Sequence, residues 1–497
     1  MTALLALPIV LPIIGAAASI LAGRIKTVQR AISLAVLSAN VVLATVLLIR
    51  VDDVGVAAVQ AGGWSAPMGI TLVADRFSAL MLCVATVMLL AVAVYAIGQP
   101  GAERHHVGFQ SVYLVLAAGV SASFLTGDLF NLFVAFEMML TASYVLMTLG
   151  GTAAQVRSGM TYVVISLIAS ALFVTSLALV YAATGTVNLA DLAGKMAELP
   201  EGVRTAFSVL LLVVFGIKAA LFPLFFWLPD AYPTAPGPVT AVFAGLLTKV
   251  GVYAIVRTQT LLFPEDSRSG TLILVVAGLT MVVGVLGAIA QNDVKRILSF
   301  NIVSHIGFMM MGLGLFTVAG LAAAVFYTVH HIVAKTAMFL TSGLIEHVGG
   351  SGRLSRLGGM VRTAPVVAVL FLIPALSLSG IPPLSGFVGK LGLVVAGVEA
   401  RAYVIVAVSM AVSLLSMYSM IRIWNGAFWS AAQEEPEGEP HAVGPLGGPA
   451  LMIVPTAVLA IAGVVLGVFG SPLWELSERA ASDLLRPTAY IDEVLRP

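Results

Sequence analysis

The chain has 497 residues, of which 60% are hydrophobic and only 10% are charged, and its mean hydropathy is +1.05. Soluble chains contain roughly 45–50% apolar and about 25% charged residues, so this composition excludes both soluble domains and a disordered chain. The formal net charge of +1 gives no electrostatic basis for nucleic-acid binding. A single cysteine, Cys83, excludes intrachain disulfides and thiolate-held clusters. We therefore expect a lipid-embedded protein with no cofactor or metal ion of its own in this chain.

Apolar runs long enough to cross a bilayer follow one another along the whole chain. Hydrocarbon about 30 Å thick needs roughly 20 helical residues, and the runs lack the strict alternation of a membrane β-barrel. They predict an all-α polytopic membrane protein with about fourteen transmembrane helices. The predicted spans are 3–22, 31–50, 72–97, 110–126, 129–149, 160–183, 205–228, 236–257, 270–290, 297–316, 318–346, 365–397, 401–429 and 451–472.

Lysine and arginine in the short loops predict the orientation, because these residues favour the cytoplasmic side. The loops after every second span contain Arg24, Lys26, Arg30, Arg104, Arg157, Lys295, Arg296, Arg353, Arg356, Arg362 and Arg422. The opposite loops are mainly acidic, and the basic residues among them are Lys195, Arg204, Arg257 and Arg268. We expect both termini outside the cytoplasm and a solvated cytoplasmic loop at 433–441. The tail from Leu473 is mildly amphipathic, which favours a plain surface tail over a segment that docks on a neighbour.

Two proline-rich segments interrupt the apolar helices. One contains Phe222-Pro223 in the seventh span, and the other contains Ile381-Pro382-Pro383 in the twelfth. Proline removes an amide donor, and unwound backbone survives at membrane depth only inside protein or beside water. Interruptions at corresponding positions of two halves are typical of an ion path in transporters.

The separation of the two interruptions by five helices predicts two five-helix repeats. The predicted organisation places helices 1–3 in residues 1–109, the first repeat in 110–258 and the second repeat in 270–430. A cytoplasmic loop, helix 14 and the tail make up 431–497.

Five charged side chains lie inside apolar spans: Glu137, Lys218, Lys249, Lys335 and Lys390, so that four of the seven lysines are there. Each central charge costs about 2.5–3.5 kcal/mol on insertion scales, and five cost about 12–17 kcal/mol. That sum rivals the stability of an ordinary domain, so a purely structural role explains it poorly. Buried lysine can gain and lose a proton near neutral pH, whereas arginine stays charged. We interpret these residues as a proton path, loaded and unloaded as Glu137 moves towards or away from Lys218; salt bridges and snorkelling side chains are the structural alternatives.

Histidines accompany one of these lysines. His331 and Lys335 are four residues apart and share a helix face, whereas His330 points about 100° away from His331. The two histidines therefore cannot both chelate a metal ion with Lys335, and a charged lysine does not ligate. The pattern favours a proton relay over a metal site, with structural histidines in the bundle as the alternative; for His305 the two readings are equally open.

Four segments together resemble the proton-conducting antiporter-like membrane subunits. They are FNLFVAFEMML around Glu137, FGIKAALFPLFFWLPDAYPTAPGPV around Lys218, AGLLTKVGVYAIVR around Lys249, and the following QNDVKRILSFNIVSHIGFM. That superfamily includes large membrane subunits of respiratory complex I, subunits of membrane-bound hydrogenases, and subunits of Mrp multisubunit sodium/proton antiporters. The resemblance covers about spans three to thirteen. The chain length and the amino-acid sequence around Glu137 are most similar to those of the D-type Mrp subunits.

The resemblance implies fourteen helices in which two five-helix repeats are inverted relative to each other and the seventh and twelfth helices are broken. It implies that Glu137 and Lys218 form the coupling pair and that Lys249 connects them to the central axis. It places on that axis His330, His331 and Lys335. Lys390 is implied at the far half-channel, although some relatives have glutamate there, which leaves open the side that this position serves.

The same resemblance implies a secondary transporter subunit rather than an enzyme, in a bacterial plasma membrane. Its expected partners are the other subunits of an Mrp-type complex, protons and Na⁺. The alternative is a proton-pumping membrane subunit of a complex I-like NADH-quinone oxidoreductase or of a membrane-bound hydrogenase.

Overall fold

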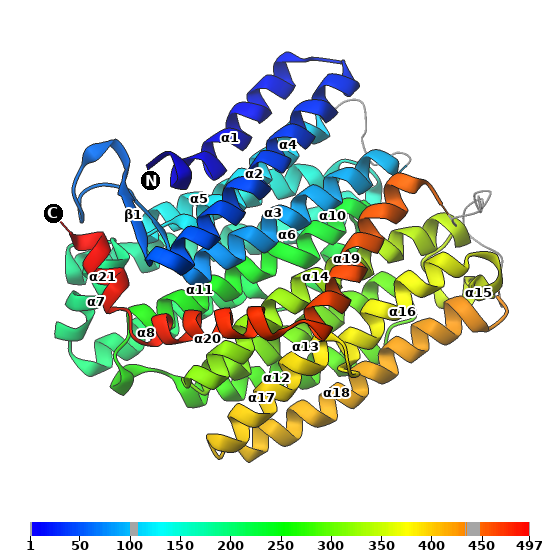
Figure 1. Ribbon diagram of the computed structural model, residues 1–497. Coiled ribbons are helices and arrows are strands. Elements are labelled where there is room, and N and C mark those ends of the chain that lie inside the picture. Colours follow the sequence, from blue (N-terminus) through cyan, green and yellow to red (C-terminus); the bar gives the residue numbers. More distant parts are fainter. Residues whose placement is uncertain (1, 100–107, 433, 435–447, 497) are drawn as a thin grey trace.

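The computed structural model describes residues 2–99, 108–432, 434 and 448–496, so Arg104 and nearly all of the loop expected at 433–441 lie outside the described residues. The described chain is almost entirely helical (Figure 1). Among the described residues, twelve helices are long and apolar enough to cross a membrane, and two shorter apolar helices, Phe109–Leu125 and Pro365–Ser379, lie in two further expected spans. The predicted all-α polytopic fold is confirmed, while the number fourteen and the repeat boundaries stay predictions.

The first part of the chain combines three long helices with a short β-hairpin. Its elements are α1 (Thr2–Leu21), α2 (Lys26–Val54), β1 (Ala57–Gln60), η1 (Ala61–Gly63), β2 (Thr71–Ala74) and α3 (Arg76–Gly98). The strands pair antiparallel, with Ala57 opposite Ala74. The prediction that the third helix starts at residue 72 is wrong. Strand β2 ends at Ala74, and Asp75 caps α3 by accepting a hydrogen bond from the Ser78 amide.

The middle part of the chain forms the helices around the first break. They are α4 (Phe109–Leu125), α5 (Leu129–Thr148), α6 (Ala153–Thr184), α7 (Leu189–Glu198), α8 (Glu201–Ala219), α9 (Trp227–Ala231), η2 (Tyr232–Thr234), α10 (Gly237–Val242), the π-helical turn η3 (Phe243–Leu247) and α11 (Thr248–Leu261). The short α7 is amphipathic and begins at Asn188, whose side chain caps it.

The last part contains the second break and the C-terminal tail. Its elements are η4 (Glu265–Ser267), α12 (Gly270–Ile289), α13 (Val294–Gly314), α14 (Val318–Gly349), η5 (Leu354–Arg356), α15 (Met360–Thr363), α16 (Pro365–Ser379), α17 (Ser385–Glu399), α18 (Tyr403–Trp424), η6 (Asn425–Trp429), α19 (Ala450–Val468), α20 (Ser471–Leu485) and α21 (Thr488–Leu495).

The two breaks share their local geometry. The residues that cap the C-terminal ends of α8 and α16, Ala220 and Gly380, both have left-handed backbone, with φ values of 61° and 84°. In each, the capping amide bonds back to carbonyls of the last turn, and a proline follows three residues later, at Pro223 and Pro383. Proline cannot continue a helix, so both interruptions follow directly from the sequence. The prediction of broken seventh and twelfth helices is confirmed.

Three helical segments form the centre of the bundle. In the 18-residue apolar stretch of each helix, 100% of the residues are buried in Gly237–Leu261, 94% in α13 and 89% in α14. In the outer helices α1, α6 and α12, only 33–39% of these residues are buried. The central segments also have lower mean hydropathy, 1.3–1.9, than those three outer helices, at 2.4–2.7. Polar side chains are therefore concentrated where protein, and not lipid, surrounds them.

The expectation of a plain surface tail was wrong, because α20 and α21 pack on the chain itself. In Figure 1, α20 crosses the bundle against α14 and α3, and α21 then reaches α7 and β1. Ala480, Ala481 and Leu484 belong to the buried face of α20. We call the end of the bundle that holds β1, β2, α7 and α21 the hairpin end.

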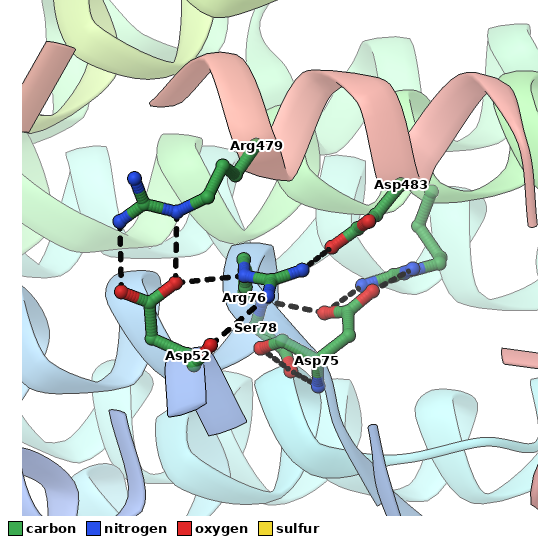
Figure 2. Close-up of polar contacts among 7 residues, drawn as sticks. Asp52, Asp75, Arg76, Ser78, Arg479 and Asp483 are labelled. Atoms are coloured by element: carbon green, nitrogen blue, oxygen red, sulfur yellow. Dashed lines mark hydrogen bonds and ion pairs between the residues drawn. The ribbon is translucent and has the colours of Figure 1, made fainter. Parts of the chain in front are cut away.

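A group of ion pairs joins this tail to the body at the hairpin end. Arg479 of α20 bonds both carboxylate oxygens of Asp52 at 3.0 and 2.7 Å. Figure 2 shows Arg76 between two carboxylates, with Asp52 at 2.8 Å and Asp483 at 2.7 Å. These four residues link α2, α3 and α20, so charge pairing and apolar burial together fix the tail.

Candidate functional site

The expected coupling residues lie on neighbouring helices but do not touch directly. Glu137 projects from α5 and Lys218 from the last turn of α8, directly before the first break. Between them stands Ser170 of α6, whose hydroxyl donates to Glu137 Oε1. Lys218 Nζ donates to Ser170 Oγ and to the Ser166 carbonyl, each at 3.3 Å. A serine therefore links the acid and the base.

A small cavity adjoins Lys218. Its walls include Tyr162 and Ser166 of α6 and Trp227 of α9. Its volume is about 10 Å³, which is close to the minimum volume that can hold one water molecule. The Trp227 indole donates to the Ile217 carbonyl at 3.0 Å, which fixes this wall against the helix break.

Lys249 lies at the start of α11 and is completely buried. Its Nζ donates to the Ala244 carbonyl at 2.5 Å and to Thr248 Oγ1 at 3.1 Å. Ala244 belongs to the π-helical turn η3, a distortion that often marks functional positions in helices. The lysine thus has two neutral acceptors, and no ion pair to it occurs in the described parts of the chain.

The histidines gather on α13 and α14 around Tyr327. His305 Nδ1 and Tyr327 Oη are 2.5 Å apart, and the rings of His305 and His331 have centroids 5.3 Å apart. His330 Nδ1 lies 2.8 Å from Ser385 Oγ, at the start of α17. His330 is therefore partly satisfied, whereas neither ring nitrogen of His331 has a hydrogen-bond partner among the described residues.

The second break receives Lys390. Its Nζ donates to the carbonyls of Leu378 at 2.9 Å and Ser379 at 3.3 Å, at the end of α16. The same ammonium lies 5.1 Å from the centre of the Phe308 ring, within cation–π range. The last turn of α16, directly before the break, thus supplies the acceptors that this lysine uses.

Lys335 has the fewest hydrogen-bond partners of the four lysines among the described residues. It is fully buried in α14, and its Nζ has no hydrogen-bond partner among the residues that the structure describes. It lies one turn from His331 on the same helix. Within the described residues, no group of three or more His, Cys, Asp or Glu side chains is placed to hold a metal ion.

The sequence analysis did not single out several hydroxyl-bearing residues that contact the expected ones, among them Ser170, Ser385 and Tyr327. Serines in apolar helices usually bond their own helix, so their type alone gives no signal. Ser385 could have been suspected, because it follows the Pro382-Pro383 break. These contacts form three separate groups: one across α5, α6 and α8, one at η3 and α11, and one across α13, α14 and α17.

Residues 126–416 match the family described as NADH:quinone oxidoreductase/Mrp antiporter, TM. The chain belongs to this family. It is 44% identical, over 498 residues and 100% of both chains, to the D-type subunit of the Na(+)/H(+) antiporter of Alkalihalophilus pseudofirmus. The predicted family resemblance is thereby confirmed.

Solved structures show the same likeness. The fold matches a chain in the structure of the Mrp complex from Dietzia sp. DQ12-45-1b with a TM-score of 0.92 and 35% identity, covering 100% of both chains. It also matches a chain of the membrane-bound sulfane sulfur reductase, an archaeal respiratory membrane complex, with a TM-score of 0.89 and 28% identity over 99% of both. The family fold therefore occurs both in an Mrp complex and in a respiratory complex.

Proposed function

We propose that this chain is the proton-translocating subunit of a multisubunit cation (Na⁺)/H⁺ antiporter in a bacterial plasma membrane. It acts as a secondary transporter subunit and not as an enzyme. The other subunits of an Mrp-type complex are its partners, and the Na⁺ gradient is coupled to proton movement through this chain. Its similarity, over the full length, to a D-type subunit of a Na(+)/H(+) antiporter supports this assignment.

One observation carries the proposal: four buried lysines cross the bundle, and each has only neutral acceptors or none among the described residues. Lys218 and Lys390 bond hydroxyl and carbonyl oxygens beside the two helix breaks, and Lys249 does so in the centre. A buried charge without a carboxylate partner is costly, so a fold retains it when it has a function. Lysine, unlike arginine, can give up its proton when desolvated.

Each residue of the path has a distinct proposed role. Glu137 and Lys218 form the coupling pair in the first half, and Lys249 passes the proton to the centre. His330, His331 and Lys335 carry it along the central axis. Lys390 exchanges it at the second break, beside the last turn of α16.

The proposed orientation places both termini outside the cytoplasm, with the hairpin end on that side. It is supported by the basic loop residues at the opposite end of the bundle, whereas Arg76, Arg257 and Arg479 at the hairpin end are paired with carboxylates. There Lys295 pairs with Glu346, Arg422 bonds Asn292, and Arg353 forms a backbone bridge with Asp293. Basic residues favour the cytoplasmic face.

The test measures Na⁺-triggered collapse of a pH gradient in inverted vesicles from cells that make the complete complex. We expect collapse that persists when respiratory inhibitors are present, and we expect Glu137→Gln to abolish it while the complex still assembles. Full flux in Glu137→Gln would contradict the role of the coupling pair. Co-purification with iron–sulfur or quinone-reducing subunits would instead favour the redox-driven alternative, for which the likeness to the sulfane sulfur reductase is the supporting observation.

A further inference from the structure

Ser170 departs from the usual behaviour of hydroxyls in this bundle. On the same helix α6, Ser176 donates to the Leu172 carbonyl at 2.7 Å and Thr175 to the Ala171 carbonyl at 2.8 Å. Such bonds to the preceding turn are the default for serine and threonine in apolar helices. Ser170 is also buried, yet its hydroxyl leaves its own helix and donates to Glu137 of α5.

The same hydroxyl serves a second partner. A serine hydroxyl has one donor and two acceptor positions, so it can donate to a carboxylate and accept from an ammonium at once. Lys218 Nζ lies 3.3 Å from Ser170 Oγ and 3.3 Å from the carbonyl of Ser166, one turn earlier. One turn of α6 therefore holds the lysine, and its last residue also holds the acid.

The bridge has a direct consequence for the two charges. In the described structure, Glu137 and Lys218 form no ion pair within 4.0 Å, although both contact the same hydroxyl. A direct pair would hold the lysine proton by the full attraction of the carboxylate. A bridged pair keeps part of that attraction and leaves the proton easier to release.

We propose that Ser170 is a positioning residue that keeps Glu137 and Lys218 in a bridged, not direct, pair during transport. This inference rests on the proposed function, because it concerns how the coupling pair works. In the bridged state the hydroxyl proton stays on Ser170, and the transported proton is bound to and released from Lys218 Nζ. Without the hydroxyl, the carboxylate can approach the ammonium and retain its proton.

The test replaces Ser170 in the complete complex and measures Na⁺-dependent proton flux in inverted vesicles as a function of pH. We expect Ser170→Ala to lower flux about tenfold or more, the order of one lost hydrogen bond to a charged group. We also expect the pH of the half-maximal rate to increase, because a lysine paired directly with a carboxylate releases its proton only at a lower proton concentration. Ser170→Thr keeps the hydroxyl and is expected to retain most of the flux and the original pH profile.

The matched control is Ser176→Ala, which removes a buried hydroxyl of the same helix that bonds only its own backbone. It is expected to leave rate and pH profile unchanged. Ser170→Cys is a second variant of similar size with a weak donor, and it is expected to behave like Ser170→Ala even if the alanine variant assembles poorly.

The outcomes separate the two claims. If Glu137→Gln is inactive while Ser170→Ala and Ser170→Cys keep the rate and pH profile of the original chain, the bridge is wrong and the proposed function stands. If Glu137→Gln keeps full flux, the coupling pair itself is wrong and the bridge falls with it. A lower rate with an unchanged pH profile in both Ser170→Ala and Ser170→Cys would also overturn the bridge, because lost packing alone would explain the lower rate.

Discussion

Helix α11 carries two buried cations with opposite surroundings. Lys249 and Arg257 lie eight residues apart, about two turns. The lysine donates to neutral oxygens of Ala244 and Thr248. The arginine contacts both carboxylate oxygens of Asp75, at 2.6 and 2.7 Å. One helix therefore buries an arginine with a carboxylate beside it, and a lysine with no carboxylate beside it among the described residues.

The paired site holds a fixed charge. Burial by itself would raise the pKa of the Asp75 carboxyl, but the charge of Arg257 and hydrogen bonds from Ser78 bring that pKa below its ordinary value. Arginine does not deprotonate in proteins, so the pair stays ionised at neutral pH. The rings of Tyr253 and Tyr490 lie 5.5 and 5.1 Å from the guanidinium and enclose it further.

The difference between the two sites suggests how this bundle separates structure from transport. A carboxylate beside a cation fixes the protonation state and stabilises the fold. Neutral acceptors satisfy an ammonium without preventing loss of its proton. On the proposed function, Arg257 belongs to the first class and Lys249 to the second, so replacing each of them should have different consequences.

Lys249→Met is expected to have the largest effect on flux and little effect on stability. Methionine has a similar volume but carries no proton, so Na⁺-dependent flux should fall to the level of vesicles without the complex. No carboxylate is left unpaired, so the free energy of unfolding should change by less than about 1.5 kcal/mol. Flux and thermal unfolding of the purified complex are measured on the same preparation. Flux above half the original value would remove Lys249 from the path.

Arg257→Met is expected to reverse this outcome. It leaves the buried Asp75 carboxylate without its partner, which costs about 3–5 kcal/mol of stability. The measurement is the amount of assembled complex and its unfolding temperature after gel filtration. The double variant with Asp75→Asn should recover most of the loss, because asparagine still caps α3 and carries no charge. An Arg257→Met complex as stable as the original would break the comparison.

The sequence alone distinguishes these two cations only in part. Lys249 stands out because a lysine inside an apolar run is visible in the linear pattern. The prediction that Arg257 is a basic loop residue is wrong, because Arg257 is buried and paired with a residue 182 positions away. A pairing at that separation leaves no trace in local periodicity.

The same distinction applies to the rest of the fold. The helix breaks were predictable, since proline acts within one turn. The bridge by Ser170 was not, because its partners are 33 and 48 residues away and serine usually bonds its own helix. The hairpin was missed because the sequences of β1, AAVQ, and β2, TLVA, do not alternate strictly between apolar and polar residues.

The tail provides a third kind of charge and the smallest expected effect. Asp52 and Arg479 pair almost as closely as Asp75 and Arg257, but their side chains are 28% and 44% exposed, against 4% and 5%. Water and salt screen exposed pairs, so Arg479→Ala should cost at most about 1 kcal/mol and leave flux unchanged. The unfolding temperature should approach that of the original complex as salt is raised, because both then lack this interaction. If Arg479→Ala lowered the stability as much as Arg257→Met, burial would not explain the difference in strength between the two ion pairs.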